Sequence, residues 1–335
     1  IIGHDVYNIE DLYNKITLLD FGAPGQVAMT GFSLIEMACW DCIGKKAGLP
    51  VYQLIGGAVR DKIPAYANGW YKVERTPEAF YQAAKKVVES GYKGLKFDPF
   101  GNGNLELTRE EYAGAMELIE AVSQAVGNTA QIMIEMHGRF SPHQAVEICR
   151  DIERLKPGFV EEPCRPLDVR AFKYVIEHTI VPIAAGERLY HAVAFNEVFR
   201  DRLLNIVQPD ISQCGGLLEV KKIASTAEAL SMTVAPHNVG GIIATTANVH
   251  LMASLRNGKI LEHFNDFSDS FVKNAGSPYP EVVDGYFSLP QGVGWGVVVD
   301  VEFLKNHGAE TEDGVIVDAG LNMYKTTNWN LRSKK

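Results

Sequence analysis

The chain has 335 residues, of which 46% are apolar, and its mean hydropathy is −0.05. This length fits one α/β barrel with an appendage or two ordinary domains, with enough apolar residues for a sizeable core. The net charge of −9 and the lack of long lysine or arginine clusters argue against nucleic acid and anionic membranes as partners.

The opening residues and the cysteines indicate a cytoplasmic protein with free thiols. No apolar run stands out as a membrane span, and the opening residues IIGHDVYNIE carry no basic leader, so we expect a cytoplasmic location. The five cysteines are odd in number and lie in apolar contexts. Cys39 and Cys42 have a C-x-x-C spacing within a helical pattern, but no second pair accompanies them. We therefore interpret them as buried free thiols.

The first 60 residues contain a helical region over 27–47, followed by the sequence PVYQLIGG. The tail from residue 289 has no helical period and contains short β-like pieces, GWGVVVDV and GVIVDAG. Both ends look like material packed outside the central part of the chain. We therefore predict a capping domain built from residues 1–60, as a shortened amino-terminal part, and from residues 289–335.

Between these ends, residues 61–288 alternate short apolar runs with amphipathic segments. Eight strands are predicted, over residues 63–69, 92–98, 131–137, 158–162, 182–187, 204–210, 232–237 and 259–263. Helices are predicted over residues 76–90, 109–125, 142–155, 169–178, 216–229 and 245–256. Strict alternation predicts a parallel sheet, and eight units in roughly 200 residues favour a (β/α)₈ barrel of the TIM type. No glycine-rich dinucleotide fingerprint supports an open doubly wound sheet.

Polar residues stand at the carboxyl ends of the predicted strands, where functional residues of such barrels lie. Glu135, Glu161 and Glu187 are each 26 residues apart (161 − 135 and 187 − 161), which is one strand-and-helix unit. One such residue would be an ordinary solvated loop position, but the repeat indicates a site at the barrel mouth. In chain order the set is Lys96, Asp98, Glu135, His137, Glu161, Glu162, Glu187, Asp210, His237 and Glu262.

Three carboxylates on consecutive strands repel one another unless a cation lies between them. A hard divalent cation would relieve this repulsion, and all-oxygen ligands favour Mg²⁺ over Zn²⁺. Of Glu161 and Glu162, the first ends the strand and is the predicted ligand. In the alternative interpretation each glutamate pairs with a nearby arginine, such as Arg188 or Arg165, but this leaves the equal spacing unexplained.

Lys96, His137 and His237 are suited to proton transfer beside such a metal. Each has a simpler alternative: Lys96 could extend out of the barrel rim, and His237 could cap a helix or fill the core. From the residues alone, the sequence predicts a Mg²⁺-dependent barrel enzyme with acid and base groups on opposite sides of the metal.

Eight sequence motifs resemble the enolase superfamily, mandelate racemase subgroup, and above all its sugar-acid dehydratases of the galactonate type. They are GFSLIEMACWDCIGKKAGLPVYQLIGG, GLKFD, IEMHGRF, FVEEP, AAGERLY, NIVQPDISQCGG, VAPHNVGG and ILEH. The resemblance covers residues 28–262 and implies that one Mg²⁺ per active site is held by Glu135, Glu161 and Glu187. It also implies that Asp210 orients His237 as a His–Asp dyad.

Several positions depart from the subgroup's pattern or select among its activities. The subgroup more often has Asp at the position of Glu135. Lys96 matches the first lysine of the racemase K-x-K, but Asp98 replaces the second, which argues against a lysine base. His137 resembles the histidine that protonates the leaving hydroxide in the dehydratases, and Glu262 the carboxyl group that contacts the enediolate. The family's initial three-stranded meander has no counterpart here, so part of the substrate-covering loop would be missing.

These implications predict removal of the proton α to a carboxylate and loss of water, which gives a 2-keto-3-deoxy acid. Lys96 and a protonated Glu262 are expected to stabilise the enediolate. An epimerase or racemase, a lactone cycloisomerase and a non-catalytic binding protein remain as alternatives. We expect a small-molecule carboxylate partner and a homo-oligomer. The predicted substrate-binding residues are Asp98, Arg139, Trp70, Tyr190 and His263.

Overall fold

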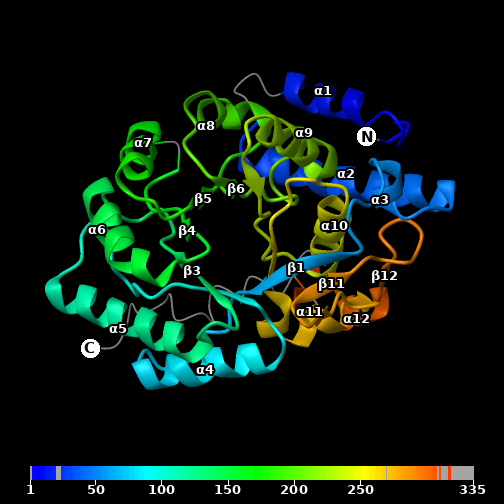
Figure 1. Cartoon of the computed structure of the whole chain (residues 1–335). Coiled ribbons are helices and arrows are strands. Elements are labelled where there is room, and N and C mark those ends of the chain that lie inside the picture. The colour runs from blue at the N-terminus through cyan, green and yellow to red at the C-terminus, as the bar shows by residue number, and fades with distance from the viewer. Residues whose placement is uncertain are drawn as a thin grey trace.

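Eight short parallel strands form a closed barrel in the computed structural model, which describes residues 2–19, 24–166, 168–268, 270–307, 309–310 and 316–317 (Figure 1). Each of β1 to β6 pairs with the next strand in the sequence, and β8 pairs with β1. Between β7 and β8 the ring is completed by a bridge from Val234 to Gly258, just before β8. The strands are β1 (Lys62–Ala67), β2 (Gly94–Phe97), β3 (Gln131–Glu135), β4 (Val160–Glu161), β5 (Ile183–Ala185), β6 (Ile206–Val207), β7 (Thr233–Val234) and β8 (Leu261–His263). The predicted barrel is confirmed.

Helices surround the strands and alternate with them along the chain. Local sequence explains where several begin: Thr76 caps α4 by accepting from Ala79 N, and Pro77 fills the first helical position. The helices between strands are α4 (Pro77–Glu89), α5 (Arg109–Val126), α6 (Pro142–Ile152), α7 (Val169–His178), α8 (Asn196–Asp201), α9 (Gly216–Ala229) and α10 (Ile242–Ala253). Six of them fall on the predicted segments; α8, only six residues long, was not predicted.

A hairpin adds two antiparallel strands to the sheet beside the first residues of β1. It consists of β10 (Val282–Val283) and β11 (Tyr286–Ser288), and β11 pairs with β1 in antiparallel register. Asp284 and Gly285, which connect the two strands, have φ of 50° and 83°. Both therefore lie in the left-handed region that tight hairpin turns require. The prediction of eight strands for residues 61–288 missed this hairpin, although an Asp-Gly turn signal is present.

The barrel interior is filled by side chains below the mouth. Tyr66, Met133, Phe159, Ala184, Ile206 and Ala235 form this buried cluster. A larger apolar cluster fills the space between the strands and the surrounding helices. Because the lower interior is packed with these side chains, the charged residues inside the barrel lie above them, at the carboxyl ends of the strands.

Segments from both ends of the chain pack outside the barrel: α1 (Ile9–Leu19), α2 (Gln26–Ala47) and α3 (Val51–Leu54) from the first, and the segment with β12 (Val298–Val299) and α12 (Val301–His307) from the second (Figure 1). The Trp295 indole donates to Met37 O, and Trp295 N donates to Asp41 Oδ1 at 3.0 Å. This contact joins the carboxyl-terminal segment to α2. The division at residues 60/61 and 288/289 stays a prediction, and residues 308, 311–315 and 318–335 of the last segment lie outside the described part.

Three details of these outer segments differ from the sequence analysis. Cys42 is exposed, whereas Cys39 is buried as predicted. By length and composition α2 could cross a membrane, alone among the described helices, so the expectation that no run is long enough was wrong. In this fold α2 contacts α9 and buries Glu36. The tail also contains a helix, α12 (Val301–His307), besides β12 (Val298–Val299), β13 (Ala309–Glu310) and β14 (Ile316–Val317). Before the tail lie α11 (Ser270–Asn274) and β9 (Gly276–Ser277), and β9 pairs with β12.

Candidate active site

The predicted charged residues converge at the carboxyl ends of the barrel strands. Glu135 on β3 and Glu161 on β4 are direct partners in the parallel register, so their side chains share one face. Glu187 follows β5, and Asp210 and His237 form a parallel bridge beyond β6 and β7. The mouth of the barrel therefore collects side chains that are separated by whole strand-and-helix units in the sequence.

Lys96 lies among three carboxylates inside the barrel. Its Nζ is 2.5 Å from Glu161, 3.0 Å from Glu262 and 3.1 Å from Glu135, and the residue is 1% exposed. It does not extend out of the rim, which rules out that alternative. Burial lowers the pKa of Lys96, but the carboxylates of Glu161 and Glu262 outweigh it and raise the pKa well above its usual value. Lys96 is thus a fixed cation, in agreement with the argument against a lysine base.

The two carboxylates of β3 and β4 are held by further donors. Glu135 accepts from His137 N at 2.7 Å, and Glu161 accepts from Gln208 Nε2 at 2.6 Å. Burial and then the charge of Glu135 raise the pKa of Glu161 well above its usual value. This shift shows that negative charge is crowded around Glu161, which is the condition that a bound cation relieves.

Glu187 contacts His237 and Arg188 in this structure. Its Oε2 is 3.4 Å from His237 Nε2, and its Oε1 is 3.3 Å from Arg188 Nε. Within the described residues, no three acidic, histidine or cysteine side chains are close enough together to hold a metal ion. The chemistry of the donors still fits a hard divalent cation, since all three are carboxylates at the ends of neighbouring strands.

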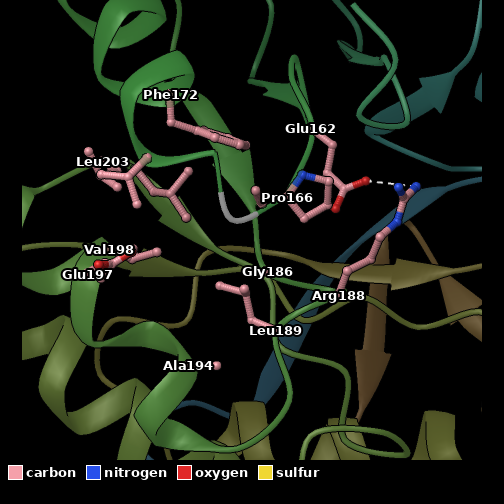
Figure 2. A pocket seen from close by; sticks show the side chains of 13 residues that line it. Glu162, Pro166, Phe172, Gly186, Arg188, Leu189, Ala194, Glu197, Val198 and Leu203 are labelled. Carbon is pink, nitrogen blue, oxygen red and sulfur yellow. Dashed lines mark ion pairs between the residues drawn. The ribbon is translucent and has the colours of Figure 1, made fainter. Parts of the chain in front are cut away.

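Arg188 and Glu162 form an ion pair beside Glu187. Arg188 lies 2.9 Å from Glu162 Oε2 and donates to the carbonyl of His137 at 3.3 Å. Figure 2 shows the pair at one side of a hollow of about 440 Å³, part of it open to solvent, whose other walls include Phe172 and Leu203. Burial, then the charge of Glu187, raises the pKa of Glu162 to about 9. The alternative of glutamates paired with Arg188 therefore holds for Glu162 and in part for Glu187.

His237 and Asp210 form a close pair. His237 Nδ1 is 2.7 Å from Asp210 Oδ2, which leaves Nε2 directed towards Glu187. Burial lowers the pKa of His237, but the charge of Glu187 and the hydrogen bond to Asp210 raise it well above its usual value. His237 is therefore neither a helix cap nor an apolar core residue.

His137 belongs to a second histidine–aspartate pair, which the sequence analysis did not predict. Its Nδ1 is 2.9 Å from Asp98 Oδ2, and Arg139 Nη2 donates to both oxygens of Asp98 at 2.7 and 2.8 Å. Burial lowers the pKa of His137, but Glu135 and Asp98 raise it overall. Asp98 therefore contacts both His137 and Arg139, and the role of Asp98 and Arg139 as substrate contacts stays a prediction.

Glu262 on β8 is surrounded by donors. Asn68 Nδ2 donates to it at 2.7 Å and Asn238 N at 2.8 Å, in addition to Lys96. Burial raises the pKa of Glu262, but Lys96 and His237 lower it overall. Glu262 is therefore a carboxylate here, which corrects the expectation of a protonated group.

Three amides at the site were not predicted from the sequence, although they follow β1, β6 and β7 as the charged residues follow their strands: Asn68, Gln208 and Asn238. The rule that identified the carboxylates would have found these side chains had it been extended to uncharged polar residues.

Three predicted substrate-binding residues lie elsewhere or at the rim. Both ring nitrogens of His263 contact tyrosines, Tyr92 at 2.6 Å and Tyr279 at 3.1 Å, on the outer face of β8. The Trp70 indole donates to Lys96 O and is packed among aromatic rings, 6% exposed. Both side chains are engaged in these contacts, and their role in substrate binding stays a prediction. Tyr190 is half-buried against the cluster formed by α1 and α2.

Two family descriptions match this chain. Residues 79–303 match the enolase C-terminal domain-like family, and residues 1–56 match the mandelate racemase / muconate lactonizing enzyme N-terminal domain. The second match covers the helices α1 to α3 that pack outside the barrel.

Curated relatives include three dehydratases. The D-gluconate dehydratase of Thermoproteus tenax is 38% identical over 314 residues, 93% of this chain and 63% of that protein. The D-gluconate/D-galactonate dehydratase of Picrophilus torridus is 33% identical over 83% of this chain and 71% of its own length. The D-galactonate dehydratase of Pectobacterium atrosepticum is 31% identical over 93% of this chain and 82% of its own. The chain thus spans less than two thirds of the Thermoproteus enzyme.

Solved structures agree with the sequence relatives. A crystal structure from Mesorhizobium loti has a TM-score of 0.86 at 37% identity and covers 90% of this chain and 82% of that one. The mandelate racemase/muconate lactonizing enzyme from Jannaschia sp. CCS1 has a TM-score of 0.83 at 30% identity over 90% and 80% of the two chains. The sequence relatives, the barrel fold and the residues at the barrel mouth indicate the same family. The chain belongs to the mandelate racemase/muconate lactonizing enzyme family of the enolase superfamily.

Proposed function

We propose that this protein is a Mg²⁺-dependent sugar-acid dehydratase that converts an aldonate or aldarate into a 2-keto-3-deoxy acid. One observation carries the proposal: two histidine–aspartate pairs, His237–Asp210 and His137–Asp98, stand on opposite sides of one barrel mouth. They belong to β7 and β3, which are four strands apart in a ring of eight. Dehydration across a carbon–carbon bond needs one group to remove a proton and another to donate one. The names of the relatives, D-gluconate and D-galactonate dehydratases, support the same substrate class.

Glu135, Glu161 and Glu187 would hold the Mg²⁺, as three carboxylates on neighbouring strands. The ion would act as a Lewis acid and a template for the substrate carboxylate. Lys96 contacts two of these glutamates and Glu262, so it spreads positive charge across the floor of the mouth.

The two histidines divide the proton transfers. Asp210 holds Nδ1 of His237, so Nε2 is the atom that would take the proton from C2. A cation held by Glu187 would offset the charge that raises the pKa of His237 and so would leave Nε2 free to act as the base. Asp98 holds Nδ1 of His137, so Nε2 of that ring gives a proton to the C3 hydroxyl as it leaves. The resulting enol becomes the 2-keto-3-deoxy acid without further help from the protein.

An anionic substrate also needs an accessible cation at the mouth. Arg139 and Arg188 both pair with carboxylates, but the Arg188 side chain is 39% exposed and the Arg139 side chain 17%. We therefore assign charge balance for the substrate to Arg188 together with the metal. The predicted cytoplasmic location and homo-oligomeric state stay predictions.

The direct test incubates the protein with Mg²⁺ and a set of aldonic and aldaric acids that includes D-gluconate and D-galactonate. We expect a 2-keto-3-deoxy acid from at least one of them, loss of turnover in excess EDTA, and recovery when Mg²⁺ is added back. A C2 epimer as the sole product would establish the epimerase alternative. Neither turnover nor deuterium exchange at C2 with any acid would leave a binding protein, and full turnover in EDTA would refute the metal.

A further inference from the structure

Asp210 is held by more than its histidine. Its Oδ2 accepts from His237 Nδ1 at 2.7 Å and from Gln213 Nε2 at 3.1 Å, and its Oδ1 accepts from Ser212 N at 2.7 Å. Gln213 N also donates to the carbonyl of Asp210 at 3.1 Å, so a tight turn folds the Gln213 side chain back onto the carboxylate. Ser212 N and the Gln213 amide therefore hold the Asp210 carboxylate in place, and the His237 imidazole is its third partner.

The other end of the Gln213 amide is bound to the first residue of α2. Gln26 Nε2 donates to Gln213 Oε1 at 2.8 Å, across 187 residues of sequence. A primary amide has one donor end and one acceptor end. Because the Asp210 carboxylate only accepts, the NH₂ group of Gln213 faces Asp210 and its oxygen faces Gln26, whose NH₂ group satisfies it. The reversed amide would set the Gln213 oxygen against Asp210 and would lose the present donor from Gln26.

Gln26 is in place because α2 holds the whole loop between Asp210 and α9. Gly215 N donates to Ser33 Oγ at 2.9 Å, and Leu217 N donates to Glu36 at 2.9 Å. A Cβ on Gly216 would lie 2.1 Å from Glu36 Oε2, so only glycine fits where the loop meets the helix. These contacts span nearly three turns of α2 and fix its register against the barrel.

We propose that Gln213 and Gln26 are positioning residues for the base, and that α2 controls the orientation of His237 through them. The assignment rests on the proposed function, in which His237 removes the C2 proton. The chain of contacts runs from Gln26 through Gln213 and Asp210 to His237, with donor and acceptor matched at each step. It makes the activity of a barrel residue depend on a helix outside the barrel.

The kinetic test reverses the donor at position 26. Gln26→Glu replaces the donor with acceptors, turns the Gln213 amide around and sets its oxygen against Asp210. We expect Gln26→Glu and Gln213→Ala to lower kcat about three- to tenfold with KM unchanged. Gln26→Ala, which only removes the donor, should lower kcat less. Gln26→Lys, which keeps a donor at this position, should have the same kcat as the wild type.

Val27→Ala is the matched control, because Val27 lies on the same turn of α2 and is 88% exposed. It should leave kcat unchanged.

A second readout does not depend on turnover. In the wild type, the Nδ1 proton of His237 should give a slowly exchanging NMR resonance because Asp210 holds it. Gln213→Ala and Gln26→Glu should speed its exchange with solvent, and Gln26→Lys should not. If no sugar acid is dehydrated but this pattern is seen, the positioning role stands and the proposed function fails. Equal effects of Gln26→Glu and Gln26→Ala, or an unchanged resonance in Gln213→Ala, would overturn the positioning role.

Discussion

The two imidazoles at the barrel mouth are oriented by aspartates, but their surroundings differ. His237 faces Glu187 and is almost fully buried, whereas the His137 side chain is 27% exposed and follows a strand end with φ of 50°. The more exposed ring is suited to meeting a leaving hydroxyl, and the buried ring to removing a proton away from water.

Replacing each histidine should separate the two proton transfers. His137→Asn should reduce water loss by about 100- to 10,000-fold while His237 still exchanges the C2 proton with D₂O. His237→Asn should lose both exchange and dehydration. NMR of the recovered substrate measures the exchange, and a 3-fluoro analogue, whose leaving group needs no proton, should partly escape the His137→Asn defect. Retained exchange in His237→Asn would place the base elsewhere.

Lys96 should matter for stability as well as for chemistry. Removing one member of a buried ionic group leaves the others uncompensated, so Lys96→Met should lower the free energy of unfolding by about 3–5 kcal/mol in EDTA. Excess Mg²⁺ should recover part of this loss if it binds among the same carboxylates. Urea titrations in the two buffers measure both effects, with the exposed Lys93→Met as control. Wild-type stability of Lys96→Met in EDTA would contradict the ionic role.

Charge and spacing allowed the sequence to predict which residues meet at the mouth, but not which atoms pair. Asp98 was predicted to contact substrate, but its pairing with His137 and Arg139 was not predicted. Such pairing depends on side-chain rotamers and on neighbouring strands, and no sequence spacing encodes either.

At the scale of elements, long amphipathic helices were predictable and short ones were not. The helices α7 and α9 match the predicted ranges because ten or more residues carry a clear hydrophobic period. In contrast, α8 and α12 have six and seven residues, too few turns for a period to show. The β10–β11 hairpin is short as well, but its Asp-Gly turn was a readable signal.

The hairpin turn provides a prediction at this scale. A Cβ at Gly285 would lie 2.6 Å from Lys93 Cγ and would require a side chain at φ of 83°. Gly285→Ala should therefore lower the free energy of unfolding by about 1–2 kcal/mol. Asp284→Gly, at the neighbouring left-handed position, should have little effect. Urea unfolding of the two variants measures the difference, and equal stabilities would show that the turn is not strained.

At the scale of the whole molecule, His250 joins the barrel to the segments outside it. His250 Nδ1 accepts from Tyr52 N at 3.0 Å, and its Nε2 is 3.0 Å from Trp295 O. The neutral ring satisfies both contacts, whereas a proton on Nδ1 would face the Tyr52 N–H. Burial accordingly lowers the pKa of His250 to about 4.

This histidine should make stability depend on pH. With a pKa near 6.5 unfolded and near 4 folded, the unfolded chain binds the extra proton between these values. The contribution is therefore fully present above pH 6.5 and is lost as the pH falls to 4, by up to about 3 kcal/mol. Urea titrations across this range should show a smaller pH slope for His250→Gln than for the wild type. Equal pH slopes for His250→Gln and the wild type would show that other groups cause the pH dependence of stability.

The closure of the barrel has a consequence for how the protein is made. Glu262 on β8 contacts Asn68, which follows β1, across 194 residues of chain. While the ribosome is still synthesising the last strand, β1 and β7 are open edges, because the strand that closes the ring has not emerged. Open edges readily pair with other chains. A nascent chain that already contains Glu135, Glu161 and Glu187 therefore still has unpaired strand edges. Only the synthesis of β8 closes the barrel and removes these edges as sites of aggregation.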